Sequence, residues 1–84
     1  MKNEDKHKLT LDQPANYQIK VPGELGEEWA DWIGDIAISV ERADKGLPVT
    51  TLTGALDQSA LLGLLRRLYS LGLPLISIIC LDYK

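Results

Sequence analysis

Residues 17–21 alternate between apolar and polar side chains, which is typical of a half-buried strand. The apolar positions that we expect to face inward are Tyr17, Ile19 and Val21. Pro22 and Gly23 follow directly. Proline donates no backbone hydrogen bond and glycine permits a turn, so the pair predicts the end of this strand.

Two further segments alternate in the same way and are separated by a turn signal. Residues 35–43 place Ile36, Ile38 and Val40 on one face, and residues 47–54 are rich in threonine and β-branched side chains. Asp44 and Gly46 lie between them, and both residue types favour turns. The pattern predicts an antiparallel hairpin.

Helical periodicity appears twice. The shorter pattern predicts a helix over residues 26–33, with apolar positions at Leu25, Trp29, Trp32 and Ile33. The longer pattern covers residues 57–72, with a leucine stripe at Leu61, Leu64, Leu65, Leu68 and Leu71. Asp57 fits the N-cap, Gly72 fits the C-terminal cap, and Gly63 within the helix predicts a close neighbour there.

The final segment, residues 73–81, is apolar on both faces of the strand that it predicts. One face would carry Leu75, Ile79 and Leu81, and the other Ile76, Ile78 and Cys80. We expect the second set to face the helices.

The order of these elements is strand, helix, strand, strand, helix, strand. It predicts an α+β fold, a ferredoxin-like βαββαβ two-layer sandwich. Its four-stranded antiparallel sheet would have two helices on one face, with the first and third strands central. Residues 1–14 are expected to form a flexible tail, and residues 15–84 a single domain.

The stretch from Thr50 to Ile78 resembles a family of small uncharacterised bacterial proteins with a pattern like LTGxxxDQxxLxGLL followed by LGLPLxS. The similarity extends over about residues 17–80. The positions that carry it are Leu52, Thr53, Gly54, Asp57, Gln58, Leu61, Gly63, Leu64, Leu65, Leu71, Gly72, Leu73, Pro74, Leu75 and Ser77. Many relatives have histidine where this chain has Leu62. The resemblance implies a fold and a class, and no activity.

Composition excludes several function classes. The net charge of −3 argues against nucleic-acid binding, which needs a basic surface. One cysteine and one histidine exclude the usual zinc and iron–sulfur sites, so we expect no metal and no cofactor. The polar start of the chain carries no secretory signal, and no apolar stretch is long enough to cross a membrane. The sequence predicts a cytoplasmic protein.

Three polar residues are candidate ligand-binding groups. Asp57 and Gln58 lie at a helix N-terminus, where backbone N–H groups attract anions, although a helix cap is the favoured explanation for Asp57. Tyr17 is the one proton donor expected on the inward face of the sheet. We identify no catalytic residue, and we expect that the protein is not an enzyme.

The leading hypothesis is therefore a non-catalytic homo-oligomeric interaction or regulatory module, acting as a homodimer or with another protein. Leu75, Ile79 and Leu81 would form its dimer interface, because three large aliphatic side chains on an edge strand are unusual on a monomer. The alternatives are a small-molecule sensor domain and a cofactor-free isomerase or monooxygenase of the dimeric α+β-barrel type.

Overall fold

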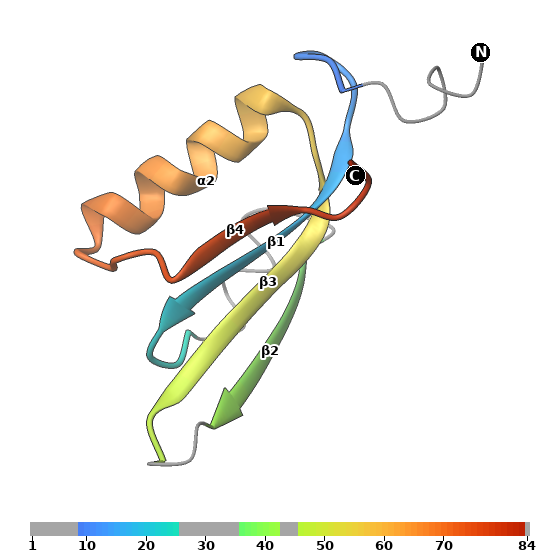
Figure 1. The fold of residues 1–84 in the computed structure, drawn as a ribbon. Coiled ribbons are helices and arrows are strands. Elements are labelled where there is room, and N and C mark those ends of the chain that lie inside the picture. The colour runs from blue at the N-terminus through green and yellow to red at the C-terminus, as the bar shows by residue number, and fades with distance from the viewer. Residues whose placement is uncertain (1–8, 26–35, 43–45, 84) are drawn as a thin grey trace.

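The computed structural model describes residues 9–25, 36–42 and 46–83, and these form four strands and one helix. Figure 1 shows the helix on one side of the sheet. In chain order the elements are β1 (Ala15–Pro22), β2 (Ala37–Arg42), β3 (Pro48–Leu56), α2 (Gln58–Ser70) and β4 (Ser77–Cys80).

The four strands form one antiparallel sheet in the order β2-β3-β1-β4. β1 and β3 are central, and β2 and β4 are the edges, as the sequence predicts. The predicted hairpin is confirmed, because β2 pairs with β3 from Ala37 opposite Thr53 to Arg42 opposite Pro48. Long-range pairing then places β4 beside β1, with Cys80 opposite Tyr17.

The prediction of a two-helix ferredoxin-like sandwich is wrong. The described residues form four antiparallel strands with a single helix, α2, so the architecture is not βαββαβ. The other helix, expected over residues 26–33, lies outside the described residues. The prediction gave an eight-residue pattern, residues 26–33, the same weight as the pattern of the thirteen residues that form α2. Isolated helices shorter than ~12–15 residues are marginal, so a pattern of that length is weak evidence for a helix.

The ends of α2 follow directly from local chemistry. Asp57 has an extended backbone and its carboxylate accepts a hydrogen bond of 2.8 Å from the N–H of Ala60, which confirms the N-cap. At the other end, Gly72 has φ +80°, a conformation that glycine adopts without strain. Its N–H donates to the carbonyl of Tyr69, and the N–H of Leu73 donates to that of Leu68. This bond pair is a Schellman motif, so the helix ends at the predicted glycine.

The core lies between α2 and one face of the sheet, which we call the helix face. Its buried apolar side chains are Ala15, Tyr17, Ile19, Val21, Ile36, Leu52, Leu56, Leu61, Leu64 and Leu68. The predicted inward positions of β1 and most of the predicted stripe of α2 are thus confirmed. Leu65 is half-buried against this core and Leu71 is exposed, because Leu71 caps the helix end rather than facing the sheet.

Candidate functional site

The three candidate ligand-binding residues, Tyr17, Asp57 and Gln58, are all engaged in contacts within the chain. The Nε2 group of Gln58 donates a hydrogen bond of 2.7 Å to the hydroxyl of Tyr17. The backbone N–H of Gln58 donates to the carbonyl of Leu11 at 3.1 Å. The Asp57 carboxylate is engaged as the N-cap. All three candidate ligand-binding residues therefore have partners within the chain.

Tyr17 lies on the helix face of β1, opposite Cys80 of β4. Its side chain is only 5% exposed. Burial raises the pKa of the Tyr17 hydroxyl above its ordinary value, the neighbouring Cys80 thiol raises it further, and the hydrogen bond from Gln58 opposes these effects in part. A general acid has to reach its substrate, and the Tyr17 hydroxyl is instead buried in the core and hydrogen-bonded to Gln58.

β4 forms an uncharged and exposed edge of the sheet. No charged residue occurs between Arg67 and Asp82. Large aliphatic side chains in and around the strand are exposed, and we call this set the β4 surface: Leu75, Ile76, Ile78, Ile79 and Leu81. Exposed strand edges in proteins are usually protected by charges, proline or short length, and of these only short length protects β4.

The pairing of β4 with β1 assigns its side chains to faces. Ile78 is opposite the buried Ile19 and so lies on the helix face, as predicted. Ile79 is opposite Gln18, which places it on the other face of the sheet, here called the far face. The three side chains predicted for the interface have similar exposed fractions: Leu75 44%, Ile79 47% and Leu81 42%.

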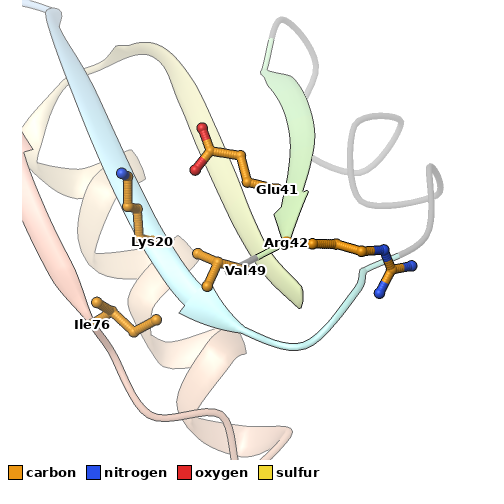
Figure 2. Close-up of a pocket in the computed structure, with 5 residues that line it drawn as sticks. All are labelled: Lys20, Glu41, Arg42, Val49 and Ile76. Carbon is orange, nitrogen blue, oxygen red and sulfur yellow. The ribbon is translucent and has the colours of Figure 1, made fainter. Parts of the chain in front are cut away.

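Ile76 departs from the predicted alternation. It lies in a bend before β4 begins, and its N–H donates to the carbonyl of Lys20 at 2.8 Å. Its side chain lines a shallow hollow that also takes in Lys20 and Glu41, side chains of the far face, rather than facing the helix (Figure 2). Pro74, two residues earlier, indicates in the sequence that the regular strand begins later than residue 73, because proline interrupts a regular strand.

The hollow on the far face has a cavity volume of about 240 Å³. Its lining residues are Lys20, Glu41, Arg42, Val49 and Ile76. Figure 2 shows opposite charges, Lys20 on β1 and Glu41 on β2, around the apolar Val49 of β3, while the Arg42 side chain points away. Arg42 instead forms an exposed ion pair of 3.6 Å with Glu24. Ile76 joins Lys20 and Glu41 here, although the predicted alternation places Ile76 on the helix face.

Thr51 is a polar residue that the sequence reading did not single out. It lies between Lys20 of β1 and Ser39 of β2 in the ladder and is 6% exposed. Its hydroxyl has no hydrogen-bond partner among the described residues. Thr50 on the helix face contrasts with it, because the Thr50 hydroxyl donates to the carbonyl of Gly23 at 2.6 Å and accepts from the N–H of Leu25.

The described ranges contain neither a cluster of metal ligands nor a membrane-spanning helix. Within them, no three side chains of histidine, cysteine, aspartate or glutamate gather where they could hold a metal ion. No helix in the same ranges has the length and apolar character needed to span a bilayer.

Comparison with known proteins identifies a family. The family model described as Domain of unknown function (DUF8691) matches residues 16–79 of the chain. The match covers all of β2, β3 and α2 and nearly all of β1 and β4. The chain therefore belongs to this family. No curated protein and no solved structure matches the chain.

Proposed function

We propose that this DUF8691 protein is a non-catalytic interaction module that forms a homodimer through its β4 surface. The observation that carries the proposal is the exposed, uncharged edge at β4. Leu75, Ile79 and Leu81, the predicted interface residues, are each more than two-fifths exposed there. Contiguous exposed aliphatic side chains of this kind usually mark a contact with another protein.

The energetics favour association. Burying one large aliphatic side chain fully contributes about 1.5–3 kcal/mol, and each copy would bury several that are at present only partly covered. Association costs an estimated 4–15 kcal/mol in lost translational and rotational freedom, so a dimer needs most of the β4 surface and not a single residue. A two-fold arrangement repeats every favourable contact that lies off its axis, which is one reason why symmetric dimers are common.

The polar cluster at the start of α2 supports a non-catalytic role. Asp57 caps the helix and Gln58 binds Tyr17, so these groups stabilise the fold. The sensor and the cofactor-free enzyme stay alternative hypotheses, and neither has a specific contact in its favour. A bacterial origin, a cytoplasmic location, the absence of cofactors and a separate protein partner also stay predictions.

Light scattering or sedimentation at micromolar concentration tests the proposal. The unaltered protein should have twice the mass of one chain, and Ile79→Glu should shift it to a single chain by placing a charge in the interface. Leu62→Glu is the matched control, because Leu62 is 51% exposed but lies on α2. A monomeric unaltered protein, or a dimer unaffected by Ile79→Glu, would contradict the proposal.

A further inference from the structure

The free edge of β4 offers the backbone groups of only two residues. The N–H of Leu81 donates to the carbonyl of Asn16 at 2.7 Å, so Leu81 directs its backbone groups toward β1. Hydrogen-bonded and non-hydrogen-bonded pairs alternate along an antiparallel ladder. Ser77 and Ile79 therefore also face β1, and the N–H and C=O groups of Ile78 and Cys80 point away from the sheet.

We infer that two copies join by pairing their β4 strands, with Ile78 of each copy opposite Cys80 of the other. This inference rests on the proposed function and adds the register of the interface. Two identical strands related by a two-fold axis within one sheet run antiparallel, so the pairing produces a continuous sheet of both copies. Ile79 then lies on the two-fold axis, opposite Ile79 of the second copy.

The register that pairs Ile78 with its own counterpart makes fewer hydrogen bonds. In the register centred on Ile79, Ile78 of each copy pairs with Cys80 of the other. These two pairs use the N–H and C=O groups of both residues in each copy and form four hydrogen bonds. Pairing Ile78 with its own counterpart would form two such bonds and then require the backbone of Ile76. The N–H of Ile76 is already donated to Lys20, so it is not available to the second copy. Unpaired backbone groups in an interface are costly, which favours the register centred on Ile79.

Side chains on both faces of the sheet fit the same register. On the far face the two Ile79 side chains form a non-hydrogen-bonded pair, in which Cα atoms approach to about 4.5 Å and side chains contact closely. On the helix face Ile78, now 39% exposed, meets Cys80 of the second copy. The axis is perpendicular to the sheet, so both α2 helices lie on the same side.

The opposite edge of the sheet is less suited to this pairing. β2 ends in Glu41 and Arg42, and both charged residues are exposed. Two copies of β2 in antiparallel contact would bring charged side chains into the new ladder, whereas β4 brings none. Charges on an edge strand are a known device against such pairing.

Disulfide trapping tests the register. All variants carry Cys80→Ser, so that each has one cysteine, and oxidised glutathione supplies the oxidant. A disulfide forms readily when Cα atoms lie about 4.4–6.8 Å apart. Ile79→Cys should give a covalent dimer on a non-reducing gel. Ile78→Cys should not, because its counterpart is displaced diagonally, and Gln18→Cys on the next strand should not either.

The outcomes separate the inference from the proposed function. Trapping of Ile79→Cys alone supports the register. A dimer in which Ile78→Cys is trapped instead overturns the register while β4 association stands. A dimer in which neither variant is trapped overturns pairing through this edge. A monomer in light scattering overturns the proposed function as well. Far-ultraviolet circular dichroism confirms that each variant is folded.

Discussion

The side chain of Gln58 reaches the Tyr17 hydroxyl at 2.7 Å and so joins the first turn of α2 to the central strand β1. The two residues are 41 positions apart in the sequence. Tyr17 is buried, and a polar group left without a hydrogen bond in a core costs about 1–3 kcal/mol. The amide of Gln58 therefore makes a tyrosine acceptable at a core position.

Stability should fall at alkaline pH because of Tyr17. Its pKa in the folded protein is raised above 10.0, mainly by burial. An unfolded tyrosine loses its proton near pH ~10, while the folded protein still holds it, so the unfolded state binds fewer protons above that pH. The contribution of Tyr17 is complete below pH ~10 and is lost as the pH rises through the folded pKa.

Urea unfolding at pH values on both sides of ~10 checks this dependence. The difference in unfolding free energy between the unaltered protein and Tyr17→Phe should shrink as the pH rises. Tyr69→Phe is the control, because Tyr69 is 85% exposed and should leave the profile unchanged. A pH-independent difference would show that Tyr17 titrates normally.

Asp57→Ala should lower the unfolding free energy by about 1 kcal/mol, because the N–H of Ala60 loses its acceptor. Asp57→Asn should restore most of that loss, since asparagine caps helices about as well as aspartate. Urea denaturation measures both. Equal loss in the two variants would indicate a role of the carboxylate charge beyond capping.

Leu68→Ala should cost about 2–5 kcal/mol, because the side chain is 1% exposed and its removal leaves a cavity. Leu65 also belongs to the predicted leucine stripe, but its side chain is only half-buried, so Leu65→Ala should cost less. Leu62→Ala, on the exposed side of the same helix, should change little. Thermal unfolding ranks the three, and a different order would mean that the helix is rotated about its axis.

Gly63→Ala should stabilise the protein by about 1 kcal/mol, since alanine favours a helix over glycine. The sequence suggested a close neighbour at Gly63, but a Cβ there meets nothing within 4 Å and the position is exposed. Gly72→Ala is the contrasting variant. It should destabilise, because Gly72 has φ +80°. Chemical denaturation of both variants should give changes of opposite sign.

Local physics made much of the fold predictable. Asp57 and Gly72 bound α2 through capping rules that act within a few residues. The alternation around Ile19 identified the buried face of β1, because a strand with one buried face has a strict period of two.

The remaining features depend on contacts distant in sequence. The hydrogen bond between Tyr17 and Gln58 requires α2 to lie over β1, which no periodicity encodes. Ile76 faces away from its predicted side because the ladder starts only at Ser77. The sequence alone suggests self-association through Leu75, Ile79 and Leu81. The register of the pairing depends on which backbone groups of β4 are hydrogen-bonded to β1, and only the structure shows that.

The adjacency of β1 and β4 has a consequence for synthesis. Ile19 has Leu52 on one side and Ile78 on the other, so its second neighbour is made almost sixty residues after it. A growing chain can form the three-stranded part of the sheet, yet one side of β1 stays unpaired until β4 emerges. Pairings between distant segments slow folding and expose strand edges to wrong partners. The intermediate in which β4 has not yet paired with β1 is therefore the state most prone to aggregate.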